Sequence, residues 1–189
     1  MIHLIGPGGA GKSTVAPVVA ALLGVAARDL DRLFDAEHGN IDAYIQAHGY
    51  AAYAGTNVET YYAHRPQTTA VFALSSGFMT YPETAHPAIA ELQRQLARAS
   101  TTVLLLPSLD RETCVAEIVR RQQTRPLAIR RSPERDEGVI RERFDVYQRL
   151  STPVVTTMQP VEAVARDIVR CIAQRPGDPG STPVLSHER

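Results

Sequence analysis

Lysine is almost absent from this chain of 189 residues, because Lys12 is the only one and all the other Lys or Arg positions are arginine. Net charge is absent too, since 20 basic residues balance 20 acidic ones. A chain without excess positive charge has no strong pull on a polyanion, so we expect no nucleic-acid partner. The single lysine directs attention to the segment around it.

Cysteine is also scarce. Cys114 and Cys171 are the only two, and they match neither a CxxC motif nor a zinc-site spacing. A chain of this length can bury a core without disulfide or metal staples. We expect both to be thiols in a reducing cytosol, with a disulfide as the alternative.

Long hydrophobic runs are missing as well. The longest apolar stretch, residues 15–27, is interrupted by Pro17 and Gly24 and is shorter than the roughly 20 residues that span a bilayer. No basic segment precedes it, so a secretory signal is not expected. These features predict a cytoplasmic protein without a membrane partner, and we expect it to be a monomer.

What is present is the composition of one soluble globular domain, with 44% hydrophobic and 21% charged residues. Short β-rich runs at 2–5, 25–28, 70–74, 103–106 and 154–157 alternate with helical stretches, and most are continuously apolar. Such runs are typical of parallel strands covered by helices on both faces, which indicates an α/β fold. A helix with one apolar stripe is expected at 161–173, and the breaker-rich residues 174–189 are expected to form a loose tail.

Residues 6–13 read GPGGAGKS and fit the phosphate-loop pattern GxxxxGK[ST], between a strand and a potential helix. In such a loop, backbone N–H groups and the helix N-terminus surround the phosphates. Lys12 would reach the β- and γ-phosphate oxygens, and Ser13 would coordinate Mg²⁺. The predicted ligands are ATP and Mg²⁺, and the predicted nucleotide-binding residues are Gly8, Gly9, Ala10, Gly11, Lys12, Ser13 and Thr14.

An alternative uses the same glycines. Gly6, Gly8 and Gly11 also satisfy the dinucleotide pattern GxGxxG, and Asp31 follows about 20 residues later, as that pattern requires. The Lys-Ser pair after the last glycine, the short chain and an arginine-rich segment downstream favour the mononucleotide interpretation.

Asp29 and Asp31 follow the second expected strand, and period-2 geometry predicts that both carboxylates point to the same side at its carboxyl end. Ligands bind at this end of open α/β sheets. Asp29 is expected to hold Mg²⁺ through water, and Asp31 to accept the proton of an attacking hydroxyl. The alternative is that Asp31 only caps a helix beginning near Arg32.

With these motifs in place, residues 1–173 resemble the shikimate kinase family. The resemblance rests on the phosphate loop, the Asp29-x-Asp31 pair, the sequence Arg125-Pro126-Leu127, and Arg143 followed by Tyr147. It implies a three-layer P-loop kinase fold with a five-stranded parallel sheet of order 2-3-1-4-5 and a lid at about 122–137. It also implies that Asp31 binds the acceptor hydroxyls and that Arg125 closes onto the transferring phosphate.

The same resemblance assigns the remaining site residues. Arg143 would bind the acceptor carboxylate, and either Arg120 or Arg121 would lie against the adenine, with Arg121 chosen here. From its place on an inward helix face, Arg143 needs an anionic partner, which is either a substrate carboxylate or a protein carboxylate. Ser76 and Gly77 would line the acceptor pocket, with Tyr53, Phe78 and Met79 as apolar walls.

Two departures concern the acceptor. Where the family has a second arginine after an aromatic residue, this chain has Ala54 after Tyr53. The pair of arginines that binds the acceptor carboxylate is then incomplete, unless Arg65 or another residue compensates. Where the family has three glycines, this chain has Ser75-Ser76-Gly77. The sequence therefore predicts an ATP- and Mg²⁺-dependent kinase for a hydroxyl of shikimate or a related small molecule. The alternatives are a kinase for another acceptor, such as a gluconate-like acid, a cyclitol or an antibiotic, and a nucleotide-binding protein without turnover.

Overall fold

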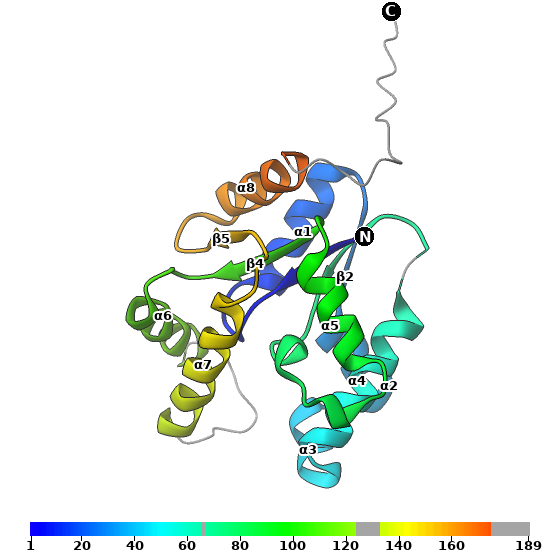
Figure 1. The fold of residues 1–189 in the computed structure, drawn as a ribbon. Coiled ribbons are helices and arrows are strands. Elements are labelled where there is room, and N and C mark those ends of the chain that lie inside the picture. Colours follow the sequence, from blue (N-terminus) through cyan, green and yellow to red (C-terminus); the bar gives the residue numbers. More distant parts are fainter. Residues whose placement is uncertain (66, 124–132, 175–189) are drawn as a thin grey trace, which may run out of the picture.

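The structure, a computed structural model, describes residues 1–65, 67–123 and 133–174. In this part of the chain, five short strands form one sheet in which every neighbouring pair is parallel. The order is β2-β3-β1-β4-β5, as predicted (Figure 1). The strands are β1 (Ile2–Ile5), β2 (Ala26–Asp29), β3 (Ala70–Ala73), β4 (Thr102–Leu106) and β5 (Val154–Thr156).

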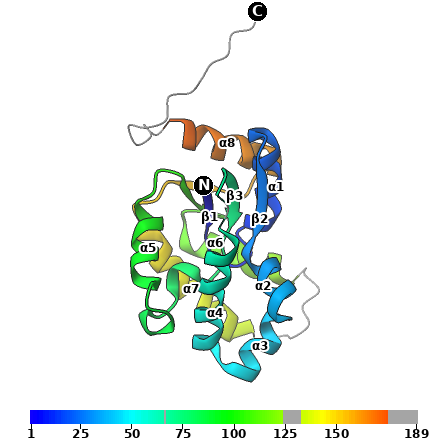
Figure 2. The same cartoon turned by 90° about the vertical axis from the view of Figure 1, so that its right-hand side faces the viewer.

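Helices cover both faces of the sheet because the strand side chains alternate between them. On one face, Leu4 and Leu105 pack against α1 (Lys12–Leu23) and α8 (Val161–Ala173). On the other face, Ile5 and Leu104 belong to a second apolar cluster. Figure 2 shows the strands with α8 above them and the helices of this second face below and beside them. The helices on that side are α2 (Leu30–His38), α3 (Ile41–His48), α4 (Tyr50–His64), α5 (Ile89–Arg98), α6 (Arg111–Gln123) and α7 (Pro133–Gln148).

The strand prediction is correct for the interior of the sheet and less so for its edge. Strands β1, β3 and β4 are buried along their whole length, as continuous apolar runs predict. In β2, Ala26 and Ala27 are exposed. The difference arises because β2 is an outer strand with a neighbour on one side only.

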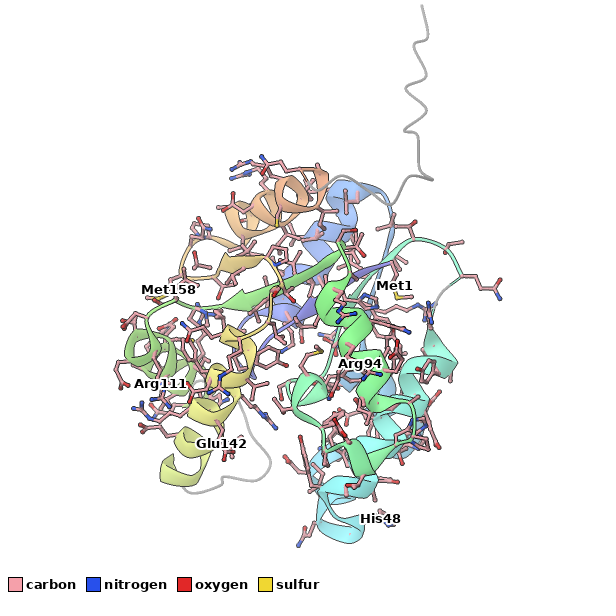
Figure 3. The ribbon with its side chains drawn as sticks, viewed as in Figure 1. Met1, His48, Arg94, Arg111, Glu142 and Met158 are labelled. Carbon is pink, nitrogen blue, oxygen red and sulfur yellow. The ribbon has the colours of Figure 1, made fainter. Side chains whose placement is uncertain are left out.

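Parallel strands end at one edge of the sheet, and the predicted site residues follow these ends. Figure 3 shows this edge with Arg111 and Glu142 on one flank and His48 on the other. The ends of the predicted lid belong to α6 and α7, whereas Arg125 and the predicted tail from residue 175 lie outside the described residues.

Two expectations about the chain as a whole can be compared with the structure. Cys114 is buried, Cys171 is partly buried, and both are free thiols. Over the residues that the structure describes, no helix combines the length and apolar character needed to cross a bilayer.

Candidate active site

The phosphate loop joins β1 to α1 at the centre of the sheet. Gly6 has a φ of +141°, and a Cβ on it would lie 2.3 Å from the carbonyl oxygen of Leu105, so only glycine fits. The Nζ of Lys12 donates to the carbonyl oxygens of Gly6 at 2.6 Å and Pro7 at 3.0 Å. Behind Gly11, α1 begins without a side-chain cap. Its N-terminal N–H groups are therefore suited to an anion.

A pocket of about 320 Å³ lies beside this loop. The hydroxyl-bearing residues Ser13 and Thr14 are exposed at the start of α1, and Thr14 lines the pocket. Ala10 is fully buried in the core against the sheet, so its side chain serves packing. The lining residues are Gly9, Gly11, Thr14, Val15, Arg121, Thr157, Gln159, Val161 and Val164.

Helix α6 supports the loop through its last turn. Arg121 donates to the Gly9 carbonyl at 3.1 Å, and to the Thr157 hydroxyl and carbonyl at 3.1 and 2.8 Å. Gln122 donates to the Gly8 carbonyl at 3.3 Å. Arg120 instead extends outward with 65% of its side chain exposed and pairs with Glu117. Of the two candidate arginines, Arg121 is the one that lines the nucleotide-side pocket.

The acidic pair is arranged differently from the prediction. Strand β2 ends at Asp29, and Asp31 already lies in the first turn of α2, so strand periodicity does not relate the two carboxylates. The cap is Asp29, whose Oδ1 accepts from the backbone N–H of Arg32 at 3.2 Å. The alternative that Asp31 caps the helix is therefore wrong. Asp31 is partly buried and close enough to Asp29 and Lys12 to interact with both electrostatically.

Asp31 is held by the loop that follows β3. The Ser75 hydroxyl donates to its Oδ1 at 2.5 Å. Burial raises the pKa of Asp31 above its ordinary value, although this hydrogen bond and the charge of Lys12 act in the opposite direction. The result is a carboxylate of increased basicity beside the phosphate loop.

Asp29 also fits a role near Mg²⁺. Its Oδ2 is buried without a hydrogen-bond partner, which leaves an anionic oxygen for a cation or its water. The exposed hydroxyl of Ser13 is a second oxygen donor, and hard oxygen donors are those that Mg²⁺ prefers. No cluster of three or more metal-ligating side chains occurs among the described residues. This donor set suits a cation bound mainly through phosphate oxygens.

Behind Ser75 lies a buried network of tyrosines. The Tyr53 hydroxyl is within hydrogen-bonding reach of Ser75 and Tyr81, and Tyr81 donates to Oδ1 of Asn57 at 3.0 Å. Burial raises the pKa of both tyrosines, so they stay neutral. The network fixes the position of Ser75 and, through it, that of Asp31.

Arg143 and Tyr147 of α7 both contact Ser76. Arg143 donates to the Ser76 hydroxyl at 3.1 Å and to the Tyr50 hydroxyl at 3.2 Å, while Tyr147 donates to the Ser76 carbonyl at 3.1 Å. Gly77 follows directly and lies beneath the Arg143 guanidinium. The predicted substrate residues Ser76, Gly77 and Arg143 are thus brought together.

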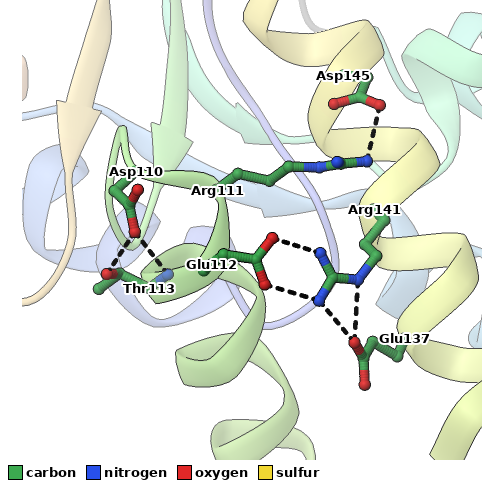
Figure 4. Close-up of polar contacts among 7 residues, drawn as sticks. All are labelled: Asp110, Arg111, Glu112, Thr113, Glu137, Arg141 and Asp145. Carbon is green, nitrogen blue, oxygen red and sulfur yellow. Dashed lines mark hydrogen bonds and ion pairs between the residues drawn. The ribbon is translucent and has the colours of Figure 1, made fainter.

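An ion-pair cluster joins α6 to α7 (Figure 4). Arg141 donates to both carboxylate oxygens of Glu112, at 2.6 and 2.8 Å, and also binds Glu137. Arg111 pairs with Asp145 at 3.0 Å. These contacts connect the helix that carries Arg121 with the helix that carries Arg143.

Three expectations about the acceptor pocket need correction. Phe78 is fully buried against Tyr61 and Tyr81, and Met79 is only 6% exposed, so they support the pocket from behind. Arg65 follows the end of α4 and acts electrostatically on His3 at the start of β1, remote from the carboxyl ends of the strands. It therefore does not replace the missing arginine.

Sequence reasoning missed Tyr50, Tyr81 and the contact between Ser75 and Asp31. A usable signal was the concentration of tyrosine in residues 44–62, which hold Tyr44, Tyr50, Tyr53, Tyr61 and Tyr62. Only the fold shows which of these hydroxyls face the site.

Comparisons with known proteins concern the fold and the family. Solved structures of shikimate kinases superpose on 91% of the chain. The enzyme from Acinetobacter baumannii in complex with shikimate is 23% identical, with 92% of its own chain covered and a TM-score of 0.66. The enzyme from Aquifex aeolicus is 23% identical, with 95% covered and a TM-score of 0.66. The enzyme from Bacteroides thetaiotaomicron is 16% identical, with 97% of its own chain covered and a TM-score of 0.67.

At these identities the structures establish the fold. None of the curated proteins matches the chain. The family itself is established by sequence, because the shikimate kinase family model matches residues 8–173. The chain therefore belongs to the shikimate kinase family, whose members are ATP-dependent phosphotransferases that generally use Mg²⁺.

Proposed function

We propose that this protein transfers the γ-phosphoryl group of Mg·ATP to a hydroxyl group of shikimate or of a closely related hydroxy acid. The observation that carries the proposal is the position of Asp31, held by Ser75 at 2.5 Å and within electrostatic range of Lys12. Transfer to a hydroxyl needs a proton acceptor beside the phosphate site, whereas a protein that only binds nucleotide does not.

In this proposal Asp31 accepts the proton of the attacking hydroxyl. Lys12 and the N–H groups of Gly8, Gly9, Ala10 and Gly11 bind the phosphates, with Thr14 and Arg121 on the nucleotide side. When bound, Mg²⁺ would be held by Ser13, with Asp29 nearby, and would neutralise phosphate charge.

Ser76, Gly77 and Arg143 position the acceptor opposite the phosphate loop. Arg125, outside the described residues, keeps its predicted contact with the transferring phosphate. The working unit in the proposal is residues 1–173, with a lid at about 122–137.

The test is ADP release from Mg·ATP in a coupled assay, with and without millimolar shikimate. Lys12→Ala is the blank for contaminating ATPase. We expect shikimate-dependent release by the wild type and a loss of about 10²- to 10⁴-fold in Asp31→Asn, with nucleotide binding retained. Nucleotide binding without any acceptor-dependent release would refute the proposed activity.

A kinase for a different hydroxy acid or cyclitol is the second candidate. Ala54 is fully buried, so this helix position presents no charge to an acceptor, and Ser75 and Ser76 add side chains beside the pocket. Gluconate-like acids and cyclitols, supplied in the same assay, distinguish the candidates: the preferred acceptor is the one with the highest kcat/KM.

A further inference from the structure

The environment of Arg143 differs from that of the neighbouring arginines. Arg141, Arg121 and Arg111 on α7 and α6 each pair with a carboxylate. Arg143 is partly buried, yet within the described residues its hydrogen bonds go only to the neutral hydroxyls of Ser76 and Tyr50. A partly desolvated guanidinium without a counter-ion favours an incoming anion.

Tyr50 is placed to share that anion. It is the first residue of α4, and 37% of it is exposed, so its hydroxyl is accessible to a ligand. Its ring packs against Tyr53 and Tyr81 with centroids 5.9 Å away in both pairs, which limits its movement. The oxygen accepts from Nη2 of Arg143 at 3.2 Å, and a phenol that accepts in this way still has its own O–H to donate.

Gly77 is what allows the two side chains to meet. A Cβ on Gly77 would lie 2.3 Å from the Tyr50 hydroxyl oxygen and 3.1 Å from Nη2 of Arg143. Its φ of −95° is open to any residue, so glycine is needed here for space and not for conformation. The space above Gly77 is therefore occupied by an N–H donor and an O–H donor from two residues that are 93 positions apart in the sequence.

We infer that Tyr50 and Arg143 together bind the carboxylate of the acceptor, and that Tyr50 is a specificity-determining residue. One cation with one neutral donor matches a monoanionic carboxylate better than a doubly charged phosphate ester. Ser75 holds Asp31, and the next residue, Ser76, holds Arg143, so one short loop positions both ends of a small hydroxy acid. The inference rests on the proposed function, since it assumes that the acceptor hydroxyl lies at Asp31.

The test compares Tyr50→Phe with the matched control Tyr62→Phe. Tyr62 lies on the same helix and is 41% exposed, and its ring packs against Tyr61 and His86. Binding of shikimate and of its uncharged methyl ester is measured by calorimetry with Mg·ADP present, alongside KM and kcat. The acid should bind Tyr50→Phe about tenfold more weakly with kcat within a factor of two, whereas the ester should bind both variants like the wild type.

Gly77→Ala provides a second perturbation, because the added methyl group would lie 2.3 Å from the Tyr50 hydroxyl, 2.9 Å from the Tyr81 ring and 3.1 Å from Arg143 and so displaces them. It should weaken binding of the acid at least as strongly as Tyr50→Phe and leave nucleotide affinity unchanged. The inference is overturned if Tyr50→Phe binds the acid like the wild type, or if acid and ester are weakened equally.

The readouts also separate this inference from the proposed function. If the acid binds and depends on Tyr50 but is not phosphorylated, the proposed activity fails while the carboxylate site stands. If the acid is phosphorylated with unchanged KM in Tyr50→Phe, the activity stands and the inference fails. If the wild type binds no carboxylic acid, the inference fails as well.

Discussion

Arg121 and Arg120 are neighbours in the last turn of α6, and the same substitution should affect them very differently. Both pair with Glu117. Arg121 is 22% exposed and also binds Gly9 and Thr157, whereas Arg120 is 65% exposed. Methionine keeps most of the aliphatic stem and has nearly the same helix propensity as arginine. The pair Arg121→Met and Arg120→Met therefore isolates the tertiary hydrogen bonds of Arg121.

The magnitude follows from these contacts. Arg121→Met removes three hydrogen bonds from a charged group to the phosphate loop and to Thr157. Each such bond contributes about 1.5–3 kcal/mol, but the three share one side chain and water replaces part of them beside the pocket. We expect the free energy of unfolding to fall by about 2–4 kcal/mol. For a chain of this size the melting temperature should then drop by roughly 5–15 °C.

Thermal unfolding with and without Mg·ADP measures both expected effects. Because Arg121 holds the Gly9 carbonyl and lines the pocket, its loss should also weaken nucleotide binding about tenfold and reduce the stabilisation by Mg·ADP. Arg120→Met should match the wild type in both measurements. Equal effects of the two substitutions, or a wild-type response from Arg121→Met, would refute the structural role of Arg121.

Three further predictions concern charge and packing. Asp31→Asn should make the protein more stable at pH 7, because burial raises the pKa of Asp31 and its ionised form is therefore disfavoured in the folded state. In urea unfolding, this gain in stability should vanish below about pH 4. A loss of stability at pH 7 would contradict the prediction. Burial lowers the pKa of His3 to about 3. The free energy of unfolding of the wild type should therefore fall by about 2 kcal/mol between pH 7 and pH 5, as the histidine of the unfolded chain takes up a proton. It should fall less in His3→Gln, and equal losses would exclude His3 as the cause. Gly138 lies in open space on α7, so Gly138→Ala should raise the free energy of unfolding by about 0.5–1 kcal/mol. Gly55→Ala should lower it, because a Cβ there would lie 2.6 Å from the carbonyl oxygen of Ala85. Changes of the same sign in urea unfolding would show that local space does not decide the outcome.

The five strands could be predicted from the sequence for a physical reason, whereas their order was implied by the family resemblance. Strands β1, β3 and β4 are buried on both faces, so their apolar runs are continuous and their boundaries are sharp. The phosphate loop could also be recognised from the sequence, because its function uses backbone groups and glycines at fixed spacing. Gly6 illustrates this point, since the Leu105 carbonyl leaves no room for another residue.

The acidic pair shows where local reasoning fails. Period-2 geometry predicts that the two carboxylates after the strand point to the same side, but the chain turns into α2 directly after Asp29, and Asp29 caps that helix. Strand and helix periodicities differ, so a shift of one or two residues in a boundary changes the direction of every following side chain. The role of Asp31 was predicted from its place after the strand, whereas its partner Ser75 lies 44 residues away.

The acceptor half of the site could not be predicted in the same way, because it is built from side-chain hydroxyls that meet over long sequence separations. Tyr50 reaches Arg143 across 93 residues, and Tyr147 reaches Ser76 across 71. No spacing rule predicts such contacts. A single hydroxyl can be added or removed at these side chains without disturbing the buried strands. The phosphate half has no such freedom, since Gly6 and Lys12 are constrained by the backbone that they touch. A change of acceptor with phosphoryl transfer retained is therefore the change that this architecture most readily permits, and Ala54, Ser75 and Ser76 are the positions where the sequence departs from the family pattern.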